Sequence, residues 1–303
     1  MRDKIAVLIP CYNEEKTVAR VVKDYKEAFP EAVVYVYDNN SVDNTVEEAL
    51  KAGAVVRKEF KQGKGNVIRK MFKDIDAECY IMVDGDCTYK PCKDMAEYIL
   101  IDGYDMVIGD RLSSSYFEEN KRPFHGIGNR VVRWLVNKLF KVRINDIMTG
   151  SRAFSYGFAK TFPVLSKGFE VETEMSIHSA FHNLSIKEVQ VDYKDRPEGS
   201  VSKLSTFSDG IKVISTIVRL FKEYKPMLFF GTISLVFFVA SVVFGVPVFI
   251  DFFRTGLVDR LPTLVFTGVL FTTSQLLFVA GVILEVIVKK NKQLFEMFWL
   301  RSK

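Results

Sequence analysis

Two long apolar segments in the C-terminal part of the sequence limit the folds open to this chain more than any other feature. The first runs from Met227 to Ile250 and the second from Leu261 to Val288, with a short polar linker between them. Each is longer than the roughly 20 residues that a helix needs to cross a bilayer. A core helix of a globular protein normally keeps a polar face, whereas the only charge in either segment is Glu285. We therefore expect residues 227–303 to form a hairpin of two transmembrane helices, at about 227–250 and 261–288, and a basic tail.

Basic residues near the ends of these segments predict the orientation in the membrane. Arg254 and Arg260 lie in the linker, whereas a larger set flanks the hairpin: Lys222, Lys225, Lys289, Lys290, Lys292, Arg301 and Lys303. Cytoplasmic segments next to membrane spans are enriched in lysine and arginine. We therefore expect a multi-pass protein of the cell membrane whose N-terminal domain and C-terminal tail are both cytoplasmic. The first apolar run, residues 5–9, is too short for the core of a signal peptide, which agrees with this orientation.

Residues 204–226, directly before the first apolar segment, have the pattern of an amphipathic helix. Leu204, Phe207, Ile211 and Phe221 recur at helical spacing, with basic residues between them. Such a helix beside a membrane span most simply lies in the membrane interface, which makes the lipid bilayer a partner. The alternative, a helix whose apolar face packs on the N-terminal domain, stays open because amphipathicity does not separate the two.

Residues 1–203 alternate between short apolar runs and longer segments of helical length. The expected strands are 5–9, 33–37, 54–57, 80–83 and 106–109, and the expected helices between them are 14–29, 43–51, 64–75 and 91–100. This rhythm is typical of βαβ units and predicts an α/β domain with a mostly parallel sheet. Sheets of this kind bind ligands at the carboxyl ends of their strands.

Polar residues gather where three of the expected strands end. Pro10–Glu14 follow the first strand, Asp38–Ser41 follow the second, and Asp84-Gly85-Asp86 follow the run Tyr80–Val83. Two carboxylates at such an edge suit a hard divalent ion, Mg²⁺ or Mn²⁺, that also binds substrate phosphates. Gly63-Lys64-Gly65 opens an expected helix, where glycines let the backbone approach a diphosphate and the lysine adds charge. The alternative is that these residues only form turns and helix caps.

Composition argues against several other classes of protein. The net charge of +5 is modest, which fits a protein on an anionic membrane surface and not one that binds nucleic acid. No GxGxxG motif follows the first strand, which argues against a dinucleotide-binding dehydrogenase. The four cysteines lack Cys-x-x-Cys spacing and are expected to be free thiols.

The order of these motifs resembles that of a known family. Pro10–Glu14, Asp38–Ser41, Gly63–Gly65, Asp84–Asp86 and a later segment, Asp146–Arg152, follow one another as in family 2 glycosyltransferases with the GT-A fold. The set is similar to the polyprenyl-phosphate glycosyltransferases, which include dolichyl-phosphate mannose and glucose synthases and membrane-anchored bacterial enzymes. The resemblance covers most of residues 4–225, and the apolar hairpin is similar to the anchor of the bacterial members.

The resemblance implies a role for individual residues on the donor side. The nucleotide-sugar donor would be bound by Pro10, Tyr12, Glu14, Asp38, Asn40, Lys64 and Asp84, with Asp38 at the nucleobase. Asp84 and Asp86 match the metal motif, which implies Mg²⁺ or Mn²⁺ as cofactor. Thr88 stands where many mannose synthases have a glutamine, which puts a third side-chain ligand in doubt and points away from mannose.

The resemblance also implies the acceptor side and the catalytic residues. The lipid phosphate or the diphosphate would be bound by Arg111, Arg196, Ser202 and Lys203, and Asp86 and Asp146 would be catalytic. Arginine and lysine suit phosphate independently of any resemblance. Two alternatives stay open: Arg196 as a surface partner of Asp195 or Glu198, and Asp146 in a turn or at a helix start. A further acidic group, Glu170, Glu172 and Glu174, offers a contact to the sugar hydroxyls.

The expected reaction is the inverting transfer of a sugar from a nucleotide-sugar donor to polyprenyl (undecaprenyl) phosphate. UDP-glucose and UDP-N-acetylglucosamine are favoured as donors over GDP-mannose. One alternative is a processive polysaccharide synthase of the same fold, because Arg130–Trp134 superficially suits a Q/R-x-x-R-W motif; a helix that packs Trp134 is the simpler explanation. A non-catalytic membrane adaptor is another alternative. The membrane helices would also permit a homo-oligomer, although no seam of small residues marks a partner face.

Overall fold

The computed structural model describes residues 2–112, 125–197 and 206–302, and its main element is one mixed sheet. Within these residues the sheet has seven strands: β1 (Asp3–Cys11), β2 (Val33–Asp38), β3 (Val55–Lys58), β4 (Ala77–Met82), β5 (Met106–Asp110), β6 (Arg152–Ser155) and β7 (Ile186–Gln190). They lie in the order β3-β2-β1-β4-β6-β5-β7, and all pairs are parallel except those that β6 makes with β4 and β5. The predicted α/β class with a mostly parallel sheet is confirmed.

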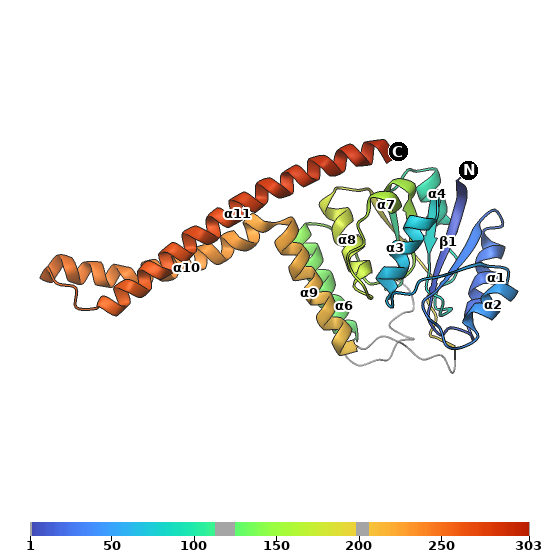
Figure 1. The fold of residues 1–303 in the computed structure, drawn as a ribbon, viewed down its shortest axis with the longest axis horizontal. Helices are drawn as coiled ribbons and strands as arrows, with labels where there is room; N and C mark the ends of the chain where they lie inside the picture. The colour runs from blue at the N-terminus through green and yellow to red at the C-terminus, as the bar shows by residue number, and fades with distance from the viewer. Residues whose placement is uncertain (1, 113–124, 198–205, 303) are drawn as a thin grey trace. The chain divides into compact units, whose positions relative to one another are not determined.

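Helices cover both faces of this sheet. The helices are α1 (Val18–Ala28), α2 (Thr45–Lys51), α3 (Lys64–Asp74), α4 (Asp94–Leu100), α6 (His125–Phe140), α7 (Tyr156–Thr161), α8 (Val171–Phe181), α9 (Thr206–Tyr224), α10 (Pro226–Thr255) and α11 (Leu261–Ser302). Helices α1 and α2 lie on one side of β1, and α3, α7 and α8 lie on the other (Figure 1). A sheet enclosed in this way offers ligands only its strand ends.

The core explains why polar residues are confined to those ends. Residues from Ile5 to Ile9 of β1 are buried, because this strand lies inside the sheet with a neighbour on each side. Ile5, Val7 and Ile9 pack in one cluster with Val18 and Val22 of α1. Successive side chains of a strand point to opposite faces, so both faces of β1 must be apolar. On this part of the chain, polar groups that bind a ligand are therefore expected where the strand ends, around Cys11.

Strand β6 runs against its neighbours and was not expected from the sequence. Arg152, its first residue, is paired with Met82 at the end of β4 and with Ile108 near the end of β5. The start of an antiparallel strand thus lies at the edge where the parallel strands end. This reversal brings the segment 145–151 to the same edge as Asp84 and Asp86.

Two other expectations were wrong in detail. The helix expected from Glu14 begins at Val18, because the backbone N–H of Glu14 donates to Thr45 Oγ1 (2.8 Å) and the segment after β1 forms a loop. Helix α6 contains Trp134, but that side chain is 57% exposed and the Lys138 ammonium lies 4.8 Å from its ring. The expectation that α6 packs Trp134 is therefore wrong.

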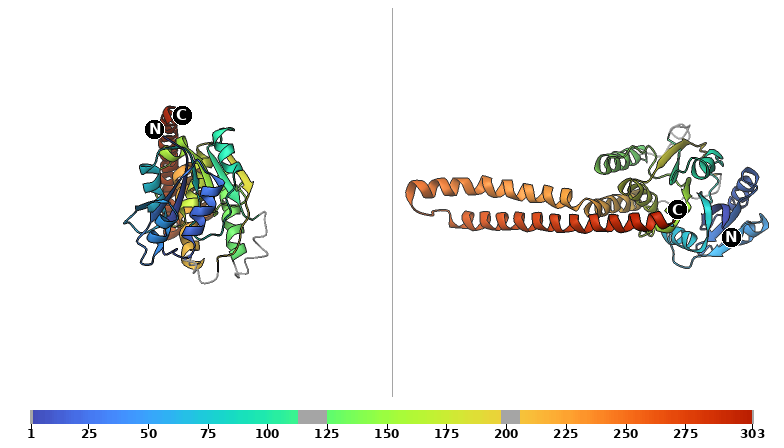
Figure 2. Two further views of the ribbon diagram at one scale, coloured as in Figure 1. Left: turned by 90° about the vertical axis from the view of Figure 1, so that its right-hand side faces the viewer. Right: turned by 90° about the horizontal axis from the view of Figure 1, so that it is seen from above.

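The C-terminal region contains two helices, α10 and α11, that are long and apolar enough to cross a membrane. They run antiparallel and side by side (Figure 2), and the Ser234 and Ser274 hydroxyls each donate to the other residue's carbonyl oxygen at 2.9 Å. Most of each apolar stretch is exposed in the protein alone, unlike a core helix. Helix α11 continues beyond Val288, where the expected span ends, through the basic segment to Ser302.

Helix α9 has one buried and one exposed apolar face. Val213 and Ile217 are buried, whereas Ile211, Ile214 and Val218 are exposed at helical spacing. The chain passes from one compact unit to another within this helix, between Ile217 and Val218. The predicted domain boundary after residue 203 lies outside the described residues.

Candidate active site

The strand order brings the predicted motifs to one edge of the sheet. Strands β2, β1 and β4 are neighbours, and Cys11 at the end of β1 pairs with Asp38 at the end of β2. Asp84 and Asp86 directly follow β4, the other neighbour of β1. The residues predicted at three separate strand ends therefore lie together.

Asp38 offers an unused acceptor in a buried position. The residue is 1% exposed, and its Oδ1 accepts from the backbone N–H of Ser41 at 3.1 Å. Its Oδ2 has no hydrogen-bond donor among the described residues, and Lys58 Nζ lies 4.0 Å away. A buried carboxylate oxygen without a donor is costly, so this atom is suited to a ligand N–H.

The two asparagines after Asp38 support a loop. Asn40 Nδ2 donates to the carbonyl of Phe60 (3.0 Å) and lies 3.2 Å from Gln62 Oε1. Asn39 Nδ2 donates to two carbonyls of the same loop, and Asn39 Oδ1 accepts from the Gly63 N–H at 2.7 Å. Asn39 was not among the predicted site residues, yet it fixes the segment that leads to Lys64.

The glycines on either side of Lys64 allow this part of the backbone to lie close to the backbone of residues 166–167. A Cβ at Gly65 would lie 2.0 Å from the carbonyl oxygen of Ser166, and one at Gly63 would lie 2.2 Å from that of Lys167. Gly63 also has a φ of +125°, which disfavours any other residue. Within the described residues the glycines thus make room for the backbone of residues 166–167. The sequence had suggested that they let the backbone approach a diphosphate.

Lys64 joins two carboxylates from distant parts of the chain. Its Nζ lies 2.5 Å from Asp84 Oδ1 and 2.6 Å from Glu172 Oε1, and only 8% of its side chain is exposed. Burial alone would lower the pKa of Lys64, but the two carboxylates outweigh it and the pKa is raised. Lys64 therefore remains a cation at the strand end.

Among the three glutamates of the acidic group, only Glu172 reaches this cation. Glu170 Oε1 accepts from the backbone N–H of Gly168, and Glu174 Oε2 accepts from that of Ser166. Glu172 is 3% exposed, and its Oε2 has no hydrogen-bond partner among the described residues. Burial raises the pKa of Glu172, and Lys64 opposes that shift.

Asp86 is paired with Arg196. The sequence had left open that Arg196 serves only as the surface partner of a neighbouring carboxylate. Arg196 Nη2 lies 2.6 Å from Asp86 Oδ2, and Arg196 Nη1 lies 3.6 Å from Glu14 Oε1. Thr88 Oγ1 donates to Asp86 Oδ1 at 2.6 Å, so Thr88 binds the carboxylate oxygen that is not paired with Arg196 Nη2. Burial raises the pKa of Asp86, and nearby Asp84 adds to the shift while Arg196 opposes it.

The donor atoms at this edge fit a hard divalent ion. Asp84 and Asp86 supply carboxylate oxygens from one loop after β4, where a single glycine separates them. No cluster of three or more potential ligands from His, Cys, Asp and Glu occurs in the described residues. Two carboxylates with the remaining ligands from phosphate and water are an ordinary Mg²⁺ or Mn²⁺ arrangement.

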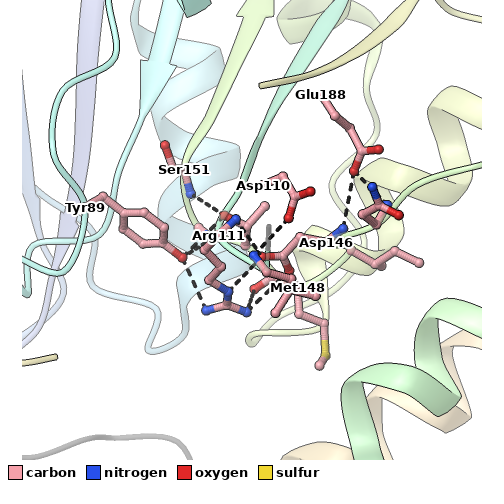
Figure 3. Close-up of polar contacts among 12 residues, drawn as sticks. Tyr89, Asp110, Arg111, Asp146, Met148, Ser151 and Glu188 are labelled. Atoms are coloured by element: carbon pink, nitrogen blue, oxygen red, sulfur yellow. Dashed lines mark hydrogen bonds and ion pairs between the residues drawn. The ribbon is translucent and has the colours of Figure 1, made fainter. Parts of the chain in front are cut away.

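A second group of polar residues surrounds Arg111, after β5 (Figure 3). Arg111 Nε donates to Asp146 Oδ2 at 2.8 Å, and its Nη2 donates to the Met148 carbonyl at 3.2 Å. Asp146 is 1% exposed; burial raises its pKa, and the Arg111 guanidinium opposes the shift. The carboxylate of Asp146 is thus engaged with Arg111 in this structure.

Two side chains, partly buried Glu188 and buried Arg152, hold the segment that carries Asp146. Glu188 Oε1 accepts from the backbone N–H groups of Asn145 (2.7 Å) and Asp146 (3.3 Å). Arg152, fully buried, donates to the carbonyls of Ile147 (2.6 Å) and Thr149 (3.2 Å). Glu188 was not singled out by the sequence, because it lies far from Asp146 along the chain.

The segment also touches the donor side, and the remaining predicted residues can be placed. A Cβ at Gly150 would lie 2.1 Å from Asp84 Oδ2, so this glycine packs on that carboxylate. Pro10 is partly buried on β1, and Tyr12 is 38% exposed in the loop after it. Ser202 and Lys203 lie outside the described residues, and their predicted contact with phosphate stays a prediction.

Several known proteins are similar to this chain in sequence. The profile of Glycosyl transferase family 2 matches residues 6–163, which include the strand ends described above. Glycosyltransferase AglJ of Haloferax volcanii is 31% identical over 298 residues, which cover 96% of each chain. Dolichyl-phosphate hexose transferase of the same organism is 27% identical over 228 residues, 75% of this chain and 97% of that protein.

Solved structures with a similar fold include glucosyl-3-phosphoglycerate synthase from Mycobacterium tuberculosis, in complex with Mn²⁺, UDP and glucosyl-3-phosphoglycerate. The TM-score is 0.59 at 19% identity, and the match covers 72% of this chain and 80% of that chain. At this identity the likeness concerns the fold alone, and it confirms the GT-A architecture that the resemblance implied.

Proposed function

The chain belongs to glycosyl transferase family 2, and we propose that it transfers a hexose from a nucleotide-sugar donor to the phosphate of a polyprenyl lipid. The observation that carries the proposal is the pairing of both motif carboxylates with cations, Asp84 with Lys64 and Asp86 with Arg196. A site that must hold both a cation and a diphosphate needs carboxylates and basic groups side by side. A non-catalytic adaptor would need neither.

On the donor side, each part of a nucleotide sugar has a suitable partner. Asp38 Oδ2, buried without a donor, would accept from an N–H of the nucleobase. Lys64 and Arg196 would bind phosphate oxygens while Asp84 and Asp86 hold Mg²⁺ or Mn²⁺. Glu172, with its second oxygen unpartnered, would accept from a sugar hydroxyl. UDP-glucose or UDP-N-acetylglucosamine is the proposed donor, supported by Thr88 in the place of glutamine.

The proposed reaction is one inverting displacement. An oxygen of the acceptor phosphate forms a bond to the anomeric carbon as the bond from that carbon to the nucleoside diphosphate breaks. A bound divalent ion supplies charge stabilisation to the leaving diphosphate. A phosphate monoester has a second pKa of about 6 and is mostly dianionic at neutral pH, so it needs no general base. Asp146, engaged with Arg111, would therefore orient the arginine that receives this phosphate.

The acceptor is proposed to be a membrane lipid because of the C-terminal region. Helices α10 and α11 are long and apolar enough to cross a membrane, and α9 exposes Ile211, Ile214 and Val218. Exposed apolar side chains beside such spans suit the membrane interface. The sequence relative named dolichyl-phosphate hexose transferase supports a polyprenyl phosphate as acceptor.

Transfer can be measured directly with the detergent-solubilised full chain. We expect labelled sugar to move from UDP-glucose or UDP-N-acetylglucosamine to undecaprenyl phosphate, with little transfer from GDP-mannose. The reaction should require Mg²⁺ or Mn²⁺ and should stop with EDTA. Thermal stabilisation by each nucleotide sugar provides a second readout, because a ligand that binds only the folded state raises its stability. Absence of transfer from every donor would contradict the proposed function.

The orientation in the membrane is likewise a proposal, with the N-terminal domain and the C-terminal tail in the cytoplasm. Thr255, at the end of α10, is exposed, and so is Lys61 in the N-terminal domain. In intact cells we expect Thr255→Cys to react with an impermeant thiol reagent and Lys61→Cys to react only after permeabilisation. The reverse pattern would overturn the proposed orientation. The unmodified chain supplies the background, since Cys11 and Cys79 are buried and Cys87 and Cys92 are partly buried.

A further inference from the structure

Two aromatic rings that contact each other lie beside Arg111. Tyr89 and Tyr193 meet edge to face, with ring centroids 5.6 Å apart. Tyr89 lies three residues after Asp86, and Tyr193 lies three residues before Arg196. The segments are joined by a β-bridge between the two tyrosines and by the Lys194 N–H, which donates to the Thr88 carbonyl at 2.9 Å. The two tyrosines are therefore fixed to the segments that supply the Asp86–Arg196 pair.

Tyr89 directs its hydroxyl toward Arg111 (Figure 3). The phenolic oxygen accepts from Arg111 Nη1 at 3.3 Å and from the Gly150 N–H at 3.2 Å, and it lies 3.3 Å from Thr149 Oγ1. The side chain is buried, and burial raises the pKa of Tyr89 to about 12. The hydroxyl is thus neutral at any ordinary assay pH.

Arg111 is held on several sides: by Asp146 and Met148 of one segment, by Tyr89 of another and by the ring of Tyr193. Asp146 binds its Nε, the Met148 carbonyl binds its Nη2, and Tyr89 binds its Nη1. The Tyr193 ring lies 5.8 Å from the guanidinium carbon, within range of a cation–π contact. Of these contacts, the hydroxyl of Tyr89 is the one that links the guanidinium to the loop after β4.

We propose that Tyr89 is a positioning residue that holds Arg111 in the orientation that receives the acceptor phosphate and links it to the loop that carries Asp86. The inference rests on the proposed function for the identity of the acceptor. Its physical basis is that a guanidinium with many rotamers binds phosphate better when its orientation is fixed in advance.

The test compares Tyr89→Phe with Tyr98→Phe in the full chain. Tyr98 packs edge to face against Tyr104, with centroids 5.9 Å apart, and lies on α4 away from Arg111, so it is a matched loss of one hydroxyl. We expect Tyr89→Phe to raise the KM for undecaprenyl phosphate about tenfold, as for the loss of a hydrogen bond to a charged group. The KM for the sugar donor should stay within about twofold, and Tyr98→Phe should change neither.

A double-mutant cycle separates positioning of Arg111 from a general disturbance. If Tyr89 acts through Arg111, adding Tyr89→Phe to Arg111→Lys should cost much less than it costs in the wild-type chain. Additive effects, or equal rises in both KM values, would overturn the proposal. An unchanged acceptor KM in Tyr89→Phe would do the same.

A binding measurement distinguishes failure of this inference from failure of the proposed function. Inorganic phosphate is titrated into the solubilised chain, and the part of its binding that Arg111→Gln removes is assigned to Arg111. We expect Tyr89→Phe to weaken that part about tenfold. If the wild type transfers no sugar but this shift occurs, the function is wrong and the positioning role stands. If phosphate binds Tyr89→Phe and the wild type equally, the positioning role is wrong.

Discussion

Replacing Asp86 with asparagine is expected to reduce sugar transfer by about 10³-fold or more, the scale on which a single group that stabilises transition-state charge acts. Asparagine has almost the same shape, and Thr88 can still donate to its side-chain oxygen. The change removes one negative charge from the pair of carboxylates, Asp84 and Asp86, that we propose holds a divalent ion. Labelled-sugar transfer to undecaprenyl phosphate at saturating donor measures the loss.

Donor binding provides a second readout for the same variant. In the wild type, stabilisation by the nucleotide sugar should depend on Mg²⁺ or Mn²⁺. In Asp86→Asn that dependence should disappear, while Arg196, no longer paired with a charged residue 86, still binds the diphosphate. Asp192→Asn is a matched control, because Asp192 is exposed and pairs only at the surface with Lys90. More than a tenth of wild-type activity in Asp86→Asn would contradict the metal assignment.

Replacing Lys64 with alanine is expected to affect stability as well as activity. Lys64 is the cation shared by Asp84 and Glu172, and Glu172 is buried. Removing one partner of a buried ion pair leaves an uncompensated charge, which costs roughly 3 kcal/mol of unfolding free energy. Transfer should fall steeply too, because the diphosphate loses one of its proposed cations. Chemical denaturation of the solubilised chain, compared with the exposed Lys61→Ala, measures the effect.

The pH dependence of this variant has a definite sign. Burial raises the pKa of Glu172 above the ordinary value of 4.5 even with Lys64 present, and loss of Lys64 should raise it further. The folded state then binds more protons than the unfolded state, so stability rises as the pH falls toward 4.5. We therefore expect Lys64→Ala to lose more stability at pH 8 than at pH 5. An equal loss at both values would show that Glu172 is not the group left unpaired.

The donor side of the site could be predicted from sequence because each of its parts follows an apolar strand. Ile5–Ile9 and Tyr80–Val83 are continuous apolar runs, so the points where polar residues begin are unambiguous, and parallel pairing brings those points together. The position of Asp38, Asp84 and Asp86 at one edge of the sheet was predicted in this way, and their part in donor binding stays a prediction. Periodicity did not reveal β6, because a strand of four residues that begins with arginine resembles a loop.

The partners of the charged residues could not be read from the sequence. For Arg196, the sequence suggested phosphate binding, with a neighbouring carboxylate as the alternative; its pairing with Asp86, more than a hundred residues away, was not foreseen. Tyr89 and Glu188 were overlooked for the same reason: their contacts with Arg111 and Asp146 exist only after β5, β6 and β7 have assembled. The prediction for Trp134 was wrong for another reason: a large aromatic side chain was assumed to be buried, and the structure shows it exposed.

The reversed direction of β6 separates the chain into parts that can change independently. The chain leaves β5 at Asp110 and enters β6 at Arg152, and both points lie at the same edge of the sheet. The connection between them therefore begins and ends at one edge of the sheet, the edge that carries Arg111 and Asp146. On the proposed function, we expect exchanges in this connection to act on the acceptor side, while strands β1 to β4 remain as they are. A graft of residues 111–151 between relatives would therefore exchange the proposed acceptor side as one unit, and Gly150, which packs on Asp84, should be kept in such a graft.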